Sequence, residues 1–189
     1  YEITYGDWSS DVCSSDLTFA EYCGERSILS RIRQHKHLIV LRSFTKFYGL
    51  PGLRIGYVVT DDETARIVRA GQPPWSVNVV AQEAALAALQ DRRHAERSCS
   101  FMRRERARFV RLLGSLPGCR VFPSQANFLL MELPRRWYAR TMTARLRRQG
   151  MLVRDCSAVP GLNTQSVRLA VRTARENNRL ILALSRLLR

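Results

Sequence analysis

Short apolar runs alternate with longer amphipathic stretches along most of this 189-residue chain. Apolar runs that are rich in β-branched residues predict buried strands, here over residues 37–42, 55–60, 120–122, 127–132, 151–154 and 167–171. Apolar residues at helical spacing predict helices over residues 61–70, 78–113, 135–149 and 173–188. Strands that alternate with helices indicate an α/β architecture.

The first 17 residues, YEITYGDWSSDVCSSDL, follow neither period, contain no Lys or Arg, and are rich in Ser and Asp. The part DWSSDVCSSDL resembles the translation of the constant region of a sequencing-library adaptor, and YEI resembles the part upstream of its index. We therefore expect residues 1–17 to be a disordered artefact. Native sequence is expected to start near Thr18, and the natural protein to continue upstream of it.

The remaining chain is long enough for two small domains. We expect their boundary near the middle of the helix predicted over residues 78–113, which divides the chain into residues 18–95 and 96–189. Hydrophobic residues make up 46% of the sequence and charged residues 25%, as in ordinary globular proteins. No apolar run is long enough to predict a membrane span, so no membrane partner is expected.

The chain is strongly basic, with a formal net charge of +15. Of its 31 basic residues only Lys36 and Lys46 are lysines, so arginine carries almost all of the charge. The arginines within residues 92–111 are read as the solvated face of a helix, and no nucleic-acid partner is expected. An arginine-rich nucleic-acid-binding module stays open as a remote alternative, supported by net charge alone.

The five cysteines are widely spaced and form no CxxC pair, so neither a disulfide framework nor a zinc site is expected. A reducing cytoplasm suits such cysteines best.

The candidate chemistry lies in residues 41–57, LRSFTKFYGLPGLRIGY. Lys46 follows a predicted buried strand, Ser43 stands three residues before it, and Arg54 stands eight residues after it. An amine in this position is a candidate Schiff-base nucleophile. A hydroxyl and a guanidinium can bind one anion between them. An amine beside an anion site suits pyridoxal phosphate, which offers an aldehyde and a phosphate.

The S-x-T-K sequence with an arginine eight residues on resembles the Schiff-base motif of the class I/II aminotransferase family, fold-type I pyridoxal-phosphate enzymes. Within that family, the segments PPWSVN, SQANFLL and LVRDCSAVPGLNTQSVRLAVRTARENNRL resemble the threonine-phosphate decarboxylases of cobalamin synthesis. The resemblance covers Thr18–Arg189 and implies that residues 18–95 are the C-terminal part of the large, cofactor-binding domain. Residues 96–189 are then the small C-terminal α/β domain. Four residues in these segments are expected to shape the pocket or a dimer interface: Trp75, Ser76, Asn78 and Asn127.

The resemblance also implies a role for particular residues. Lys46 would bind the cofactor covalently, Ser43 and Arg54 would hold its phosphate, and no metal is implied. Arg168 falls where the family binds the substrate α-carboxylate, and Arg154 where the decarboxylases bind the substrate phosphate.

Asp16 lies thirty residues before Lys46 and begins D-x-x-F, the register of the aspartate that keeps the cofactor ring nitrogen protonated. Because Asp16 belongs to the adaptor-like segment, we interpret this register as a coincidence at the junction. Its carboxylate could still serve the cofactor if the fold places it there.

The function implied is decarboxylation of L-threonine O-3-phosphate to (R)-1-aminopropan-2-yl phosphate by a cytoplasmic homodimer. The alternative is a histidinol-phosphate aminotransferase or a related class I/II aminotransferase. The family's glycine-rich turn, stacking aromatic residue and asparagine segment would lie upstream of this sequence, so the chain alone is expected to be inactive.

Overall fold

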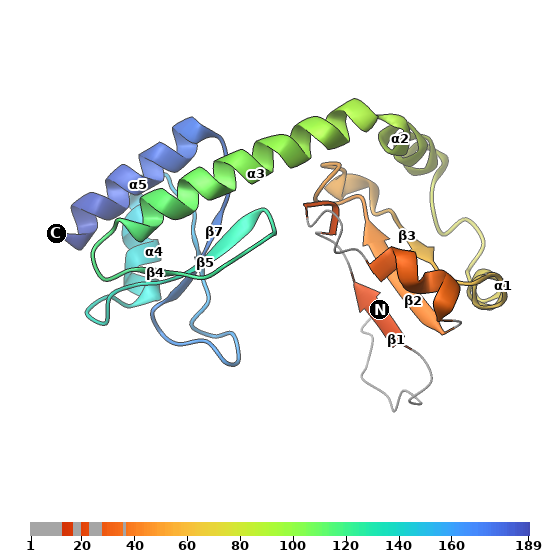
Figure 1. The fold of residues 1–189 in the computed structure, drawn as a ribbon, viewed down its shortest axis with the longest axis horizontal. Helices are drawn as coiled ribbons and strands as arrows, with labels where there is room; N and C mark the ends of the chain where they lie inside the picture. Colours follow the sequence, from red (N-terminus) through yellow and green to blue (C-terminus); the bar gives the residue numbers. More distant parts are fainter. Residues whose placement is uncertain (1–12, 17–19, 23–27, 36) are drawn as a thin grey trace. The chain divides into compact units, whose positions relative to one another are not determined.

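The computed structural model describes residues 13–16, 20–22, 28–35 and 37–189, and the chain divides into two compact units, Tyr1–Glu96 and Arg97–Arg189 (Figure 1). This division falls one residue from the boundary that the sequence predicts. Helix α3 (Arg92–Gly114) begins in the first unit and continues into the second. Among the described residues, no helix combines the length and apolar character that a membrane span requires.

The first unit contains a three-stranded sheet in the order β1 (Cys13–Asp16), β2 (Leu38–Ser43) and β3 (Gly56–Val59). β1 pairs with β2 in parallel, and β3 pairs with β2 in antiparallel orientation. The predicted strands over residues 37–42 and 55–60 are therefore confirmed. The 3₁₀ helix η2 (Ile28–Gln34) packs on the sheet, where Ile32, Leu38 and Val40 form a small buried core.

Strand β1 contradicts the expectation that residues 1–17 hold no element of the fold. Its four residues pair with residues 38–41 of β2, although the sequence CSSD has no apolar alternation. Pairing in a sheet uses backbone N–H and C=O groups, which every residue other than proline supplies whatever its side chain. The other residues of this segment, 1–12 and 17, lie outside the described residues, and the adaptor origin stays a prediction.

Helices α1 (Asp62–Ala70) and α2 (Val79–Gln90) follow β3. Asp61 caps α1 by accepting hydrogen bonds from the backbone N–H groups of Glu63 and Thr64, both at 3.1 Å. The expectation of one helix over residues 78–113 is wrong at Asp91, where the backbone leaves helical geometry with ψ at 74°. The Asp91 carboxylate instead accepts a hydrogen bond from the His94 N–H at 2.8 Å, which begins α3 as a new helix.

The second unit holds an antiparallel sheet in the order β4 (Arg120–Val121), β5 (Phe128–Glu132), β7 (Ser166–Ala170) and β6 (Arg154–Asp155). Alternate residues of β5 and β7 are buried, so the sheet has one buried face and one open face. The core also includes side chains from α3, α4 (Ala139–Arg148) and α5 (Ala174–Leu188), among them Phe109, Leu113, Met142, Leu146 and Leu184.

Two boundaries in this unit differ from the prediction by three residues or more. α4 begins at Ala139 instead of residue 135, because residues 134–137 form a turn in which the Trp137 N–H donates to the Pro134 carbonyl at 2.8 Å. β6 begins at Arg154, three residues later than predicted. The helix predicted over residues 173–188 is confirmed, and Thr173 and Glu176 form a capping box at its start.

Candidate functional site

Four of the candidate cofactor residues lie at one edge of the first sheet. Asp16 is the last residue of β1 and pairs with Leu41, and Ser43 is the last residue of β2. Because β1 and β2 are parallel, both carboxyl ends point to the same edge, where ligands of α/β sheets commonly bind. β3 runs the opposite way and starts there, with Gly56 opposite Ser43. Arg54 therefore enters the same edge just before β3, and Lys46 just after β2.

Lys46 lies at the surface, between two buried aromatic residues. Phe44 and Phe47 are 2% and 5% exposed, whereas Lys46 between them is exposed. Phe44 packs on the rings of Tyr48 and Tyr57 at centroid distances of 5.1 and 5.5 Å, and Phe47 packs edge-on against Tyr22 at 5.1 Å. These contacts fix the segment around the lysine, whose side chain is exposed.

The chain after Lys46 forms a turn at Gly49 and then re-enters the sheet at β3. Gly49 adopts a left-handed conformation with φ at 66°, and the Leu50 N–H donates to the Phe44 carbonyl at 3.2 Å. The 3₁₀ helix η3 (Pro51–Leu53) follows, and the Phe44 N–H then donates to the Ile55 carbonyl at 3.3 Å. These two hydrogen bonds close a loop that contains Lys46 and hold Leu50 and Ile55 beside Phe44.

Ser43 and Arg54 have the donor groups that a phosphate requires. The Ser43 hydroxyl oxygen accepts a hydrogen bond from the Thr45 N–H at 3.1 Å, so its own hydrogen remains to donate. Arg54 is exposed, has a left-handed backbone with φ at 49°, and donates one guanidinium hydrogen bond to the Pro51 carbonyl at 3.2 Å. Residues 43–56 contain no Asp or Glu that would repel an anion. The residues at this edge therefore fit an aldehyde with a phosphate arm, as in pyridoxal phosphate.

His94 was not among the predicted site residues, although it contacts the lysine segment. Its Nε2 lies 3.3 Å from the Phe47 carbonyl oxygen, and its ring stacks on Tyr48 at 6.3 Å. A carbonyl only accepts, so Nε2 must carry the hydrogen in this contact. The two residues are 47 positions apart, and no sequence motif connects them.

The second unit places the two candidate substrate residues side by side. Arg154 in β6 pairs directly with Arg168 in β7, and both side chains are exposed. Like charges at opposed positions of neighbouring strands destabilise a sheet unless an anion neutralises them. No ion pair among the described residues involves either arginine. The Arg168 guanidinium instead lies 5.1 Å from the centre of the Phe128 ring. This open face of the sheet is suited to an anionic ligand.

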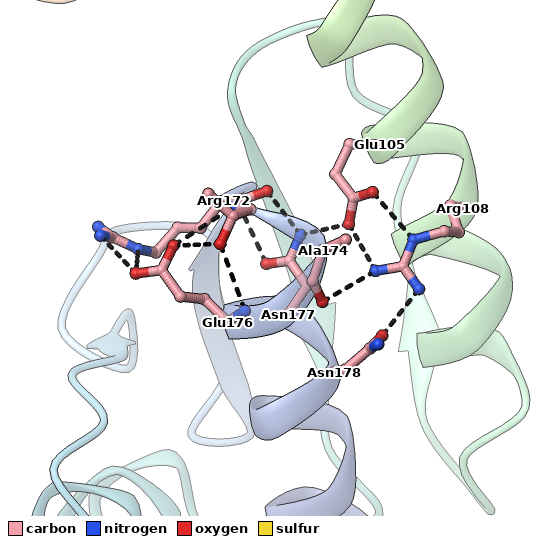
Figure 2. A network of polar contacts seen from close by, with 8 residues as sticks. Glu105, Arg108, Arg172, Ala174, Glu176, Asn177 and Asn178 are labelled. Carbon is pink, nitrogen blue, oxygen red and sulfur yellow. Dashed lines mark hydrogen bonds and ion pairs between the residues drawn. The ribbon is translucent and has the colours of Figure 1, made fainter.

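A network of polar contacts anchors the helix that follows Arg168 (Figure 2). Glu105 of α3 accepts hydrogen bonds from Arg108 and from Asn177 of α5, and Asn177 also donates to the Arg172 carbonyl at 2.9 Å. The bonds from Arg108 and Asn177 hold the pKa of Glu105 below its usual range, against the opposing effect of burial. The network fixes the connection between β7 and α5, and with it the end of the strand that carries Arg168.

The remaining predicted residues have mostly local contacts. Asn78 caps α2 through a hydrogen bond from the Ala81 N–H at 2.9 Å, and the Ser76 hydroxyl accepts from the Gln72 amide at 2.7 Å. Trp75 is 97% exposed, and its backbone has a positive φ of 56°. The Asn127 carbonyl accepts the Val171 N–H at 2.8 Å. The structure thus brings together Asp16, Ser43, Lys46 and Arg54 in one unit, and Arg154 and Arg168 in the other.

A lysine, a serine and an arginine at the end of a parallel strand pair, followed by a small α/β unit, are the arrangement expected of a fold-type I pyridoxal-phosphate enzyme. The family model for aminotransferase class I and II matches residues 11–184. The chain therefore belongs to the class I and II aminotransferase family, whose members depend on pyridoxal phosphate.

Curated relatives with two different activities match the chain. The chain is 40% identical over 165 residues to a threonine-phosphate decarboxylase of Salmonella typhimurium, covering 87% of this chain and 45% of that protein. It is 34% identical over 176 residues to a histidinol-phosphate aminotransferase of Archaeoglobus fulgidus, covering 93% of this chain and 50% of that protein. The chain thus spans about half the length of the curated relatives it matches.

Solved structures of both kinds of enzyme resemble the chain. The histidinol-phosphate aminotransferase from Clostridium acetobutylicum matches 94% of this chain and 54% of its own, with a TM-score of 0.88 and 30% identity. The L-threonine-O-3-phosphate decarboxylase from Porphyromonas gingivalis matches 93% of this chain and 54% of its own, with a TM-score of 0.83 and 32% identity. The expected fold is confirmed by both.

Proposed function

We propose that the natural protein containing this chain is a pyridoxal-phosphate-dependent threonine-phosphate decarboxylase. It would convert L-threonine O-3-phosphate into (R)-1-aminopropan-2-yl phosphate and CO₂, a step in cobalamin biosynthesis. The observation that carries this proposal is the 40% identity to a threonine-phosphate decarboxylase over 87% of the chain. A cytoplasmic homodimer is part of the proposal. The chain by itself is proposed to be inactive, because it spans about half of such an enzyme.

The residues of the first unit supply the cofactor site in this proposal. Lys46 would bind the aldehyde carbon of pyridoxal phosphate, and Ser43 and Arg54 would hold its phosphate by charge-assisted hydrogen bonds. Asp16 stands at the same sheet edge, where a carboxylate would serve the ring nitrogen. When bound, the cofactor withdraws electrons from the α-carbon of an amino-acid substrate.

The residues of the second unit orient the substrate. Arg168 would bind its carboxylate and Arg154 its phosphate, since the two arginines stand opposite each other on neighbouring strands. Decarboxylation breaks the bond between the α-carbon and the carboxylate carbon. CO₂ would leave, and Lys46, whose amine is released when the substrate amine takes its place on the cofactor, would deliver a proton to the vacated position on the α-carbon. The orientation that Arg168 imposes on the carboxylate decides whether this bond or the Cα–H bond breaks.

A histidinol-phosphate aminotransferase is the second candidate, favoured by the TM-score of 0.88 to the enzyme from Clostridium acetobutylicum. In that reaction the amino group moves to 2-oxoglutarate, and Lys46 would take the proton from the α-carbon. The arginine pair suits glutamate, which carries two carboxylates, as well as threonine phosphate. The pair therefore favours a substrate with two anionic groups without deciding between the two activities.

The experiment that separates the candidates uses the restored protein, by which we mean residues 18–189 in the uninterrupted natural reading frame. It is incubated with L-threonine O-3-phosphate, and separately with histidinol phosphate and 2-oxoglutarate. Release of CO₂ from the first substrate without glutamate formation from the second mixture is the expected result. Glutamate formation without CO₂ release would assign the aminotransferase activity instead.

A further inference from the structure

A short turn outside the predicted site contacts the lysine segment twice. Residues 20–22 form one 3₁₀ turn, which we call the 20–22 turn. Its Glu21 carboxylate forms an ion pair with the Arg42 guanidinium at 2.8 Å, and the ring of Tyr22 packs on Phe47 at 5.1 Å. Arg42 immediately precedes Ser43, and Phe47 immediately follows Lys46. The turn therefore contacts the lysine segment on both sides of the proposed cofactor residues.

These contacts lie where the sheet no longer holds the two strands together. The pairing of β1 with β2 ends at Asp16 and Leu41. Beyond that point β2 continues to Ser43, paired with β3, whereas β1 has ended, so pairing with β1 no longer holds this part of β2 or the residues after it. Glu21 and Tyr22 lie beyond the end of β1, Arg42 lies in the last part of β2, and Phe47 lies beyond the end of β2. At the sheet edge where the proposed site lies, side-chain contacts therefore hold the 20–22 turn and the lysine segment together.

The ion pair is buried, and burial makes it a poor source of stability. The Glu21 and Arg42 side chains are each only 8% exposed. Removing two charges from water offsets much of their attraction, so apolar residues of similar volume often stabilise a protein as well or better. Arg42 Nε is also buried with no hydrogen-bond partner among the described residues, which adds to the free-energy cost of burying the pair. A directional pair of this kind is better suited to fixing geometry than to adding stability.

We propose that the 20–22 turn is a positioning clamp for Lys46. The Glu21–Arg42 ion pair and the Tyr22–Phe47 contact hold residues 42–47, so that the Lys46 amine meets the cofactor aldehyde while Ser43 holds the phosphate. Glu21 and Arg42 are positioning residues and act through Lys46 and Ser43. This inference rests on the proposed function of Lys46.

The test separates positioning from stability in the restored protein. The double variant Glu21→Leu/Arg42→Met replaces the pair by apolar residues of similar size, and Glu21→Gln removes one charge with little change of shape. The control Glu63→Leu/Arg66→Met makes the same replacements at exposed positions of α1. Each variant is incubated with pyridoxal phosphate well below its own thermal midpoint and treated with borohydride, which reduces the carbon–nitrogen double bond to a stable amine. Mass spectrometry then gives the label on Lys46.

The clamp predicts that the double variant keeps a thermal midpoint near that of the unsubstituted protein but loses about tenfold in Lys46 labelling at subsaturating cofactor, because small displacements of a reacting group have effects of that size. Glu21→Gln is expected to lose labelling as well, and the control pair to lose none. Full labelling in the double variant or in Glu21→Gln would overturn the clamp and leave the proposed function intact. Absence of label on Lys46 in the unsubstituted protein would instead contradict the proposed function itself.

Discussion

Replacing Glu105 by alanine is expected to lower the free energy of unfolding of the second unit by about 2–3 kcal/mol. Glu105 is only 7% exposed. Its carboxylate accepts hydrogen bonds from Arg108 at 2.7 and 2.9 Å and from Asn177 at 2.8 Å (Figure 2). These contacts join α3 to α5, which lie far apart in the sequence.

The contributions differ between the two partners. The Arg108 side chain is 30% exposed and keeps its bonds to Asn178 and the Ala174 carbonyl, so its loss of Glu105 contributes little. Asn177 is 2% exposed; its Oδ1 still accepts from the Arg172 N–H, but its NH₂ group retains only the bond to the Arg172 carbonyl. One buried N–H is left unsatisfied, which costs about 1–2 kcal/mol. The lost burial of the Glu105 methylenes adds about 1 kcal/mol.

Urea unfolding measures this difference. Trp137 is the tryptophan of the second unit, so its fluorescence in a Trp8→Phe/Trp75→Phe background reports on that unit. Glu105→Ala should lower the urea midpoint with an unchanged slope. Glu96→Ala, at an exposed position of the same helix, should stay within about 0.5 kcal/mol of the unsubstituted chain. A Glu105→Ala value equally close to it would refute the assignment of the network as a buried anchor.

Three further predictions follow from the same contacts. Because the folded state lowers the pKa of Glu105, the ionised carboxylate stabilises the fold fully above the usual glutamate pKa of about 4.3, and this stabilisation is lost as the pH falls below that value. Glu105→Gln should therefore make the free energy of unfolding depend less steeply on pH in acid. An unchanged dependence would assign the acid loss of stability to other groups. Gly56→Ala would place a Cβ 2.6 Å from the Arg42 carbonyl oxygen and should destabilise the β2–β3 pairing by about 1–3 kcal/mol in hydrogen exchange, whereas Gly52→Ala, with nothing within 4 Å, should not; equal exchange in both variants would count against this packing. In the restored protein, Arg154→Ala should abolish the preference for threonine phosphate over threonine. Arg168→Ala should lower kcat/KM for both substrates by an amount equivalent to about 1.5–3 kcal/mol of transition-state stabilisation. If Arg154→Ala lowered kcat/KM equally for both substrates, that arginine would be structural.

Much of the fold could be predicted from local patterns. The apolar runs that became β2, β3 and β5 are short and β-branched or strongly apolar, and they have no helical period. Gly71 ends α1, and Thr173 with Glu176 begins α5, because these residues satisfy the free backbone groups of helix ends. Asp91 was overlooked because one polar residue hardly interrupts a long helical period, although aspartate is a common N-cap.

The contacts between distant segments could not be predicted in this way. The Arg154–Arg168 pairing depends on the register of two strands, and β6 is too short to have a period of its own. Glu21 and Arg42 are 21 positions apart, and His94 and Phe47 are 47 apart, so no local spacing relates them. β1 pairs with β2 although its sequence has no apolar pattern that would predict a strand.

The central claim is that Lys46 is the residue that binds the cofactor, and the two lysines of the chain make a matched test. The restored protein is prepared with Lys46→Arg and, separately, with Lys36→Arg, each of which keeps the positive charge but removes an amine. Both are incubated with pyridoxal phosphate, and the visible absorbance and the borohydride label are recorded. We expect Lys36→Arg to keep the absorbance and a label on Lys46, and Lys46→Arg to lose both. Retention of the absorbance and of a stoichiometric label in Lys46→Arg would contradict the account.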